Sequence, residues 1–213
     1  MAGLEREAQR PRILTGVQAG PDETTSLVVD VSATEAEAFY KVFQIPAPPL
    51  FEDDFETDTR WVAIVNDANG NTNWERGTPN GSTGPLSGAD DSINAWTTNL
   101  GDFGTDSDIS LRSPAIDLTG VAAAELSFDA YRDGDGFGEF ASLRFLRASD
   151  LLQLGEETVI DMTFFDADWV AQTIPVVAEA IGESVVIEFN FVSDSSPDAF
   201  SGLSIDNVRM ATP

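Results

Sequence analysis

Two carboxylates, Glu56 and Asp206, are the side chains of this sequence whose type and placement best suit binding chemistry. Asp206 stands in the middle of the short apolar run 202–210, where a charged side chain must be exposed, paired or bound to a cation. Glu56 belongs to a similar alternation of apolar and acidic residues at 51–57. If the first and last strands of the fold lie side by side, the two carboxylates can meet and hold a hard cation such as calcium.

Calcium takes roughly six to eight oxygen ligands, so two carboxylates alone do not complete a site. We therefore expect backbone carbonyl groups to contribute, together with Asp54 or Asp90. The alternative, that both acids are solvated near sheet edges, stays open. A second acidic stretch, 133–136, alternates Asp and Gly but lacks the spacing and terminal Glu of a complete calcium loop, so it predicts an acidic hairpin turn.

The composition argues against catalysis. The 213 residues include no His and no Cys, which removes a Ser-His-Asp triad, thiolate chemistry and zinc–sulfur sites. Two carboxylates can cleave a glycosidic bond. With 37 acidic residues in the chain, however, some suitable pair is always available, so the presence of such a pair is almost no evidence for glycosidase activity. We expect a protein that is not an enzyme, and a glycoside-acting enzyme is the third alternative.

Tryptophan side chains can stack on sugar rings where they are exposed. Large aromatic residues dominate the interiors of β-sandwiches, so we expect most of the four to lie in the core. Trp74 follows a polar loop and is predicted to be a ligand-binding platform on the surface. The four are Trp61, Trp74, Trp96 and Trp169.

The net charge of −26, from 37 acidic and 11 basic residues, excludes nucleic acid and anionic membranes as partners. Such a surface suits a salty or calcium-containing medium, although simple solubility explains it equally well. No apolar run reaches the roughly 18 residues of a membrane span, and residues 1–12 lack the apolar core of a secretion signal. The chain is therefore expected to be cytoplasmic, or to be an extracellular or cell-surface protein whose signal has been lost.

A proline-rich joint at 46–49 divides the sequence into two parts. Before it, three short β-rich runs predict an N-terminal arm, or the remnant of a preceding domain, over residues 1–48. After it, residues 49–213 predict a single β-sandwich. The three runs before the joint are 13–17, 26–31 and 38–45.

The second part contains many short strand-like runs between loops rich in Gly, Asn, Asp and Ser. Alternation is clearest at 125–131, 140–147 and 184–192. In the last of these, four apolar residues face a core while Glu188 and Asn190 face water. Only 167–180 has a helical composition, and Pro175 interrupts it. The fold class predicted is all-β, a two-sheet antiparallel sandwich of the jelly-roll type.

An ordered set of motifs resembles the MAM-like, concanavalin-like jelly-roll domains. These are accessory modules of secreted bacterial proteins, including immune-inhibitor-A-type metallopeptidases, and look like relatives of calcium-containing carbohydrate-binding modules. The resemblance covers about residues 50–210 and leaves the N-terminal part outside. The motifs are Asp54-Phe55-Glu56, the runs 96–100 and 111–118, Leu126-Ser127-Phe128, and the runs 186–189 and 202–208.

The resemblance implies a non-catalytic extracellular module with a structural calcium held in part by Glu56 and Asp206. The sequence departs from the family in one respect, because the usual pair of acids near the end is here Asp206-Asn207. A second ligand at that place would be an amide oxygen.

Two functions follow from these observations. The first is a binding or adhesion module that recognises carbohydrate or a protein surface. The alternative is a structural subunit of an extracellular filament or surface assembly, in which the N-terminal arm adds a strand to the sheet of another copy. The resemblance favours the first function and the arm favours the second.

Overall fold

The computed structural model of this protein describes residues 47–58, 60–197 and 199–213. The arm predicted at 1–48 falls outside these ranges except for its last two residues, so the arm and the domain boundary stay predictions. Residues Pro46–Pro213 form one compact unit. Within the described ranges, no helix has the length and apolarity needed to cross a membrane.

One antiparallel sheet, sheet A, contains both the first and the last strand of the sandwich. Its strands follow the order β10-β7-β12-β4-β3, and β1 pairs with another stretch of β12. The sheet consists of β1 (Phe51–Asp53), β3 (Trp74–Gly77), β4 (Ala95–Thr98), β7 (Glu125–Asp133), β10 (Val170–Pro175) and β12 (Gly202–Ala211).

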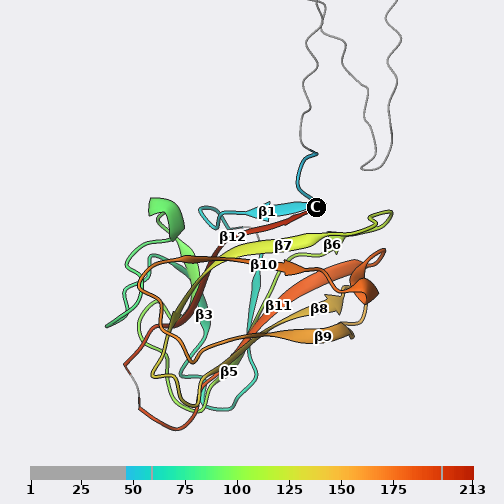
Figure 1. The fold of residues 1–213 in the computed structure, drawn as a ribbon. Coiled ribbons are helices and arrows are strands. Elements are labelled where there is room, and N and C mark those ends of the chain that lie inside the picture. The colour runs from blue at the N-terminus through green and yellow to red at the C-terminus, as the bar shows by residue number, and fades with distance from the viewer. Residues whose placement is uncertain (1–46, 59, 198) are drawn as a thin grey trace, which may run out of the picture. The chain divides into compact units, whose positions relative to one another are not determined.

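The second sheet, sheet B, has the order β2-β5-β11-β8-β9, with β6 beside β11. Figure 1 shows β11, β8 and β9 of this sheet below β12, β7 and β10 of sheet A. The predicted two-sheet antiparallel sandwich is therefore confirmed. Sheet B consists of β2 (Val62–Val65), β5 (Asp108–Arg112), β6 (Ile116–Asp117), β8 (Phe140–Arg147), β9 (Gln153–Ile160) and β11 (Ser184–Val192). Two 3-10 turns lie between strands, η1 (Ala89–Asp91) and η2 (Ala178–Ala180).

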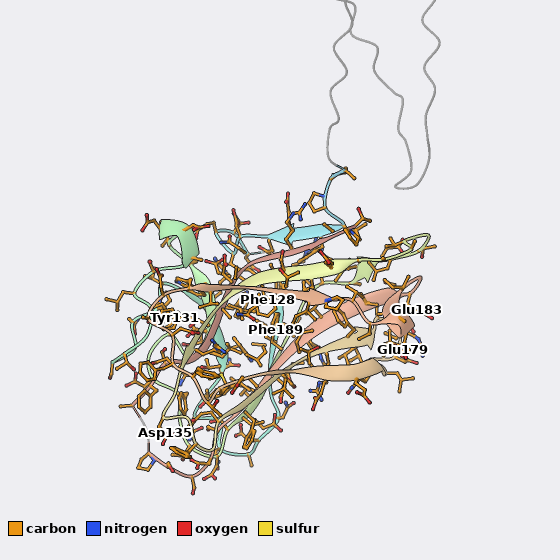
Figure 2. The ribbon with its side chains drawn as sticks, viewed as in Figure 1. Phe128, Tyr131, Asp135, Glu179, Glu183 and Phe189 are labelled. Atoms are coloured by element: carbon orange, nitrogen blue, oxygen red, sulfur yellow. The ribbon has the colours of Figure 1, made fainter. Side chains whose placement is uncertain are left out.

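The core lies between the two sheets and follows from the alternation of the long strands. The inward residues of β11, Val185, Ile187, Phe189 and Phe191, are fully buried. Phe189 meets Phe128 of β7 edge to face at 5.1 Å between ring centroids, and Figure 2 shows both rings between the sheets. Each such ring contributes about 1.5–3 kcal/mol through burial of apolar surface.

One local expectation was wrong, and one strand lies where the sequence predicted none. Residues 170–175, inside the segment of helical composition, form edge strand β10, because backbone pairing with β7 outweighs a weak local propensity. The acidic stretch 133–136 is not a hairpin turn. It starts the loop that joins β7 in sheet A to β8 in sheet B, so the strands on either side of it do not pair.

Candidate functional site

Pairing of the first and last strands brings the two predicted carboxylates to one region. In the antiparallel register of β1 and β12, Phe51 lies opposite Met210 and Asp53 opposite Val208. The chain leaving β1 therefore runs toward the middle of β12, where Asp206 lies. The prediction that the first and last strands are neighbours is confirmed.

Asp206 is fully buried although it carries a carboxylate. Its Oδ2 atom accepts hydrogen bonds from the backbone N–H of Ala89 at 2.8 Å and from the hydroxyl of Ser92 at 3.0 Å. Its Oδ1 atom accepts one from the backbone N–H of Asn207 at 2.7 Å. These three donors orient the carboxylate toward the segment that contains η1.

Glu56 holds the other end of the same segment. Its Oε1 atom accepts hydrogen bonds from the backbone N–H groups of Ile93 at 3.0 Å and Asn94 at 2.8 Å. We call residues 88–94 the carboxylate loop, since it is fastened to Asp206 at its start and to Glu56 at its end. Its 3-10 turn is the green helical ribbon in Figure 1.

The carboxylate loop directs oxygen atoms toward one point beside Gly88. A β-carbon added at Gly88 would lie 2.0 Å from Ser92 Oγ, 2.6 Å from the carbonyl oxygen of Asn94 and 2.7 Å from Asp206 Oδ2. A hydroxyl, a backbone carbonyl and a carboxylate, all oxygen donors, are the kinds of ligand that calcium takes. Ser92, Asn94 and Asp206 are therefore the residues that would hold a hard cation here. The Glu56 carboxylate is not among the atoms nearest to this point and accepts hydrogen bonds from Ile93 and Asn94.

The other two predicted ligands do not join this group. Asp54 is exposed and accepts a hydrogen bond from the backbone N–H of Glu56 at 3.1 Å, so its observed contact orients the Glu56 backbone. Asp90 is exposed in the 3-10 turn, in the left-handed conformation with φ 52°. Across the described parts of the chain, no three acidic side chains come together in a metal-binding arrangement.

Burial, with a smaller contribution from the nearby Asp129 carboxylate, raises the pKa of Asp206 from 3.8 to about 6. Hydrogen bonds from Ala89, Asn207 and Ser92 act in the opposite direction, because they favour the charged form. Desolvation has the larger effect. In the absence of a cation, ionised Asp206 thus opposes folding.

The expected result is a protein that becomes more stable on mild acidification in the presence of a chelator. Between about pH 6 and the unfolded-state pKa of 3.8, the folded state keeps a proton on Asp206 that the unfolded state has released. Asp206 therefore favours folding by about 3 kcal/mol more at the acid end of this window than above it. Urea unfolding across this window compares wild type with Asp206→Asn, which lacks this group. Parallel pH profiles of the two proteins would contradict the prediction.

Trp74 is not the surface platform that its sequence context predicts. The residue is 1% exposed, because in β3 it lies opposite Thr98 of β4 and its ring points into the sandwich. Trp61 and Trp96 are buried as well, as expected for most of the tryptophans, and Trp169 is half-buried.

The exposed aromatic residues are instead phenylalanines that sequence reasoning missed. We call Phe137, Phe140, Phe164 and Phe165 the phenylalanine patch. Their exposed fractions are 79%, 68%, 59% and 76%, and every other described phenylalanine is buried or half-buried. Phe137 lies in the loop after β7, Phe140 begins β8, and Phe164 and Phe165 lie in the loop between β9 and β10.

Arg132 of β7 fastens the loop between β9 and β10, which carries Phe164 and Phe165, to sheet A. Its guanidinium group donates to both carboxylate oxygens of Asp166 at 2.8 Å and to the carbonyl oxygen of Asp161 at 3.1 Å. The same guanidinium lies 5.7 Å from the ring centroid of Phe164, within the range of a cation–π interaction. The exposed rings of Phe164 and Phe165 are therefore presented on an anchored loop.

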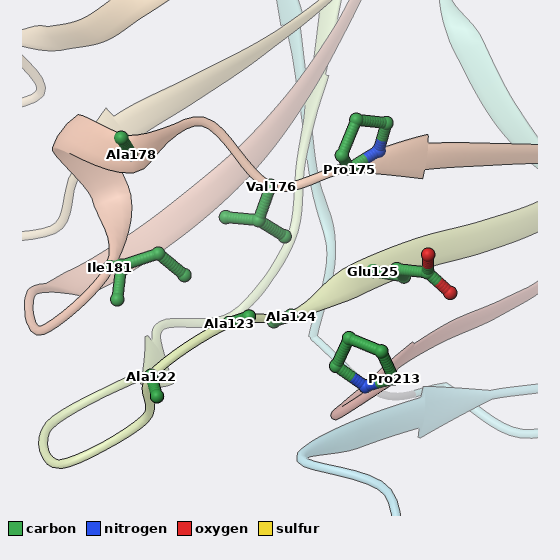
Figure 3. A pocket seen from close by; sticks show the side chains of 9 residues that line it. All are labelled: Ala122, Ala123, Ala124, Glu125, Pro175, Val176, Ala178, Ile181 and Pro213. Atoms are coloured by element: carbon green, nitrogen blue, oxygen red, sulfur yellow. The ribbon is translucent and has the colours of Figure 1, made fainter.

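A hollow of about 410 Å³ lies where β7 begins and β10 ends. The side chains that line it are apolar except for that of Glu125 (Figure 3). Figure 2 shows Glu179 and Glu183 near this end of the sandwich and Asp135, in the loop after β7, at the opposite end. The hollow therefore lies apart from the phenylalanine patch and offers no converging polar groups.

Comparison with known proteins identifies the fold. No protein-family model and no curated protein matches the chain. The K3 cleaved adhesin domain of Lys-gingipain from Porphyromonas gingivalis is similar, with a TM-score of 0.53, 19% identity, and coverage of 78% of this chain and 100% of that one. The K1 cleaved adhesin domain of the same protein gives a TM-score of 0.50 and 21% identity over 76% and 98% of the two chains.

The enzymatically active domain of tailspike protein 4 from bacteriophage CBA120 is also similar. Its TM-score is 0.50 and its identity 15%, over 75% of this chain but only 20% of that one. The match to the adhesin domains along almost their whole length shows that the sandwich has the architecture of these modules.

Proposed function

We propose that this chain is a non-catalytic extracellular module for binding or adhesion, of the MAM-like jelly-roll class, with a structural calcium. The phenylalanine patch is the observation that carries the binding function. Its four exposed rings lie on or beside two loops that approach each other at Gly136 and Thr163. Exposed apolar side chains close together mark interaction sites, and aromatic residues are enriched where proteins bind partners. The names of the two similar adhesin domains support adhesion.

Carbohydrate and protein surfaces are both suitable ligands for such a patch. Flat aromatic rings pack against the apolar faces of sugar rings and against apolar side chains alike. An enzymatic function has less support, because the two carboxylates that the fold brings together accept hydrogen bonds from the protein's own loop. The alternative of a structural subunit depends on residues 1–46, which lie outside the described ranges.

Calcium would contribute to this function by fixing the carboxylate loop against β12. The oxygen atoms around Gly88 support this assignment, as does the burial of a carboxylate with a raised pKa, since a bound cation would offset the cost of its charge. The calcium proposed here is structural and takes part in no reaction.

The double substitution Phe137→Ala and Phe165→Ala is expected to weaken ligand binding at least tenfold, about 1.4 kcal/mol. Both side chains are exposed, so the melting temperature should change little. The probe is an immobilised glycan array, followed by titration of the best-bound glycan. Leu86→Ala is the matched control, because Leu86 is 74% exposed and lies outside the patch.

Retained glycan binding by the double variant would exclude the phenylalanine patch as the ligand surface. A wild-type protein that binds no glycan on the array would exclude the carbohydrate form of the proposal.

A further inference from the structure

The outer face of sheet B carries a buried carboxylate between two arginines. Glu188 in β11 is 2% exposed, although alternation directs it outward. Arg112 Nε of β5 donates to its Oε2 atom at 2.6 Å, and Arg144 Nη2 of β8 lies 2.5 Å from its Oε1 atom. The three residues are direct cross-strand neighbours on adjacent strands. We call them the arginine clamp.

The arginine clamp holds one positive charge more than its carboxylate requires. One guanidinium neutralises one carboxylate, and the second leaves a net charge of +1 at the centre of the face. Each guanidinium offers several N–H donors in a planar fork, and Glu188 occupies only part of them. Both arginine side chains are 28% exposed, so part of each guanidinium can reach a ligand, although Arg144 Nε itself is buried.

The row of residues next to the arginine clamp presents hydroxyl and amide groups. Ser110, Asn190 and Ser142 lie opposite one another on the same three strands. The Asn190 side-chain N–H₂ donates to Asp108 Oδ1 at 2.9 Å and to Ser110 Oγ at 3.2 Å, which leaves its amide oxygen as an acceptor. Asn190 and Ser142 are half-buried and suit the hydroxyls of a sugar, whereas Ser110 is buried and holds the Asn190 amide in place.

Exposed apolar side chains border the same face. Val62 on β2 is 55% exposed and Val159 on β9 is 72% exposed. Phe140 of the phenylalanine patch lies on β8 two residues before Ser142, and alternation directs both side chains to the outer face. The face thus offers a cationic centre, a hydrogen-bonding row and an apolar border that continues into the phenylalanine patch.

We propose that the outer face of sheet B binds an acidic saccharide, with the arginine clamp recognising the carboxylate of a uronic acid unit. Charge complementarity identifies this ligand, because a planar carboxylate matches the guanidinium fork and sugar hydroxyls match the neighbouring row. This inference rests on the proposed carbohydrate-binding function and names the class of carbohydrate.

The strongly acidic protein does not prevent this recognition. At physiological ionic strength, charges more than about 8 Å away are largely screened. Near the clamp, the carboxylate of Asp108 accepts hydrogen bonds from the side-chain amides of Asn66 and Asn190, and Glu183 and Asp150 face Arg147. Further exposed acids of sheet B are Glu156 and Glu157 on edge strand β9 and Asp117 on β6, which lies opposite Ser184.

The test compares a short oligogalacturonate with a neutral galactose oligomer of equal length by titration calorimetry, with calcium present. The acidic oligomer should bind at least about tenfold more tightly, and Arg144→Lys should remove most of that difference. Lysine keeps the charge that faces Glu188 but loses the planar fork. Arg147→Lys, on the same strand and paired with Asp150 and Glu183, is the matched control and should bind like wild type.

Equal affinity for the acidic and neutral oligomers would overturn the inference and leave the proposed function intact. Equally tight binding of a poly-glutamate peptide would overturn the assignment to a saccharide. A third outcome combines two experiments: neither oligomer binds, and the protein binds no glycan on the array. That outcome would overturn the proposed carbohydrate binding itself.

Discussion

Calcium at about a hundredfold excess over its dissociation constant is expected to raise the melting temperature of the wild-type protein by roughly 5–11 °C. The reason is linkage: the oxygen atoms of Ser92, Asn94 and Asp206 converge beside Gly88 only in the folded state, so the proposed calcium ion would bind the folded protein and not the unfolded chain. Asp206→Ala should abolish this rise, since it removes the one ligand that is both charged and fully buried. Differential scanning calorimetry with calcium and with chelator measures the response.

Two further variants sharpen this test. Asp90→Asn should keep the calcium response, because Asp90 is exposed and asparagine tolerates its left-handed backbone. Glu157→Gln, at an exposed position of β9, controls for the loss of one negative charge. A melting temperature that rises equally with calcium in wild type and Asp206→Ala would show that the ion binds elsewhere.

Gly88→Ala is expected to destabilise the protein by about 2–4 kcal/mol and to remove its calcium response. The new methyl group would overlap Ser92 Oγ and approach the Asn94 carbonyl and Asp206 Oδ2, so the carboxylate loop must shift. The backbone itself is not the cause, since Gly88 has φ −66° and ψ 177°, a conformation open to any residue.

Gly101→Ala is the matched control for this substitution. The nearest atom to its added β-carbon would be Asn80 Oδ1 at 3.7 Å, which is ordinary van der Waals contact. Chemical denaturation of both variants separates crowding at the site from the general effect of replacing glycine. A Gly88→Ala protein as stable as Gly101→Ala would contradict the arrangement described around Asp206.

The strands that sequence predicted well are those with one buried face. β8 and β11 have the predicted bounds, 140–147 and 184–192, because regular alternation marks a strand with one face in the core. The edge strands β9 and β10 escaped prediction. β9 contains Gly155 and two consecutive glutamates and buries only Leu154 and Ile160, so its sequence shows little alternation.

The candidate site was predictable only in its charged residues. Asp206 stood out as an acid in an apolar strand and Glu56 as an acid in the alternating stretch at 51–57, and pairing of the terminal strands connected the two regions. The carboxylate loop had no such signal, because its contacts with Glu56 and Asp206 come largely from backbone N–H groups, which any sequence supplies. The arginine clamp was missed for another reason: the register of three strands distant in sequence brings Arg112 and Arg144 to Glu188.

The position of β12 has a consequence for how the chain reaches its fold. β12 lies inside sheet A, with β7 on one side and both β4 and β1 on the other. Before β12 is in place, only the pairs β7–β10 and β3–β4 can form in that sheet, and their inner edges stay open. Pairing Phe51 with Met210 also closes a loop that spans nearly the whole sandwich, which is entropically costly and slow. Folding of sheet A therefore waits for its final strand, and Asp206 and the carboxylate loop assemble among the last contacts to form.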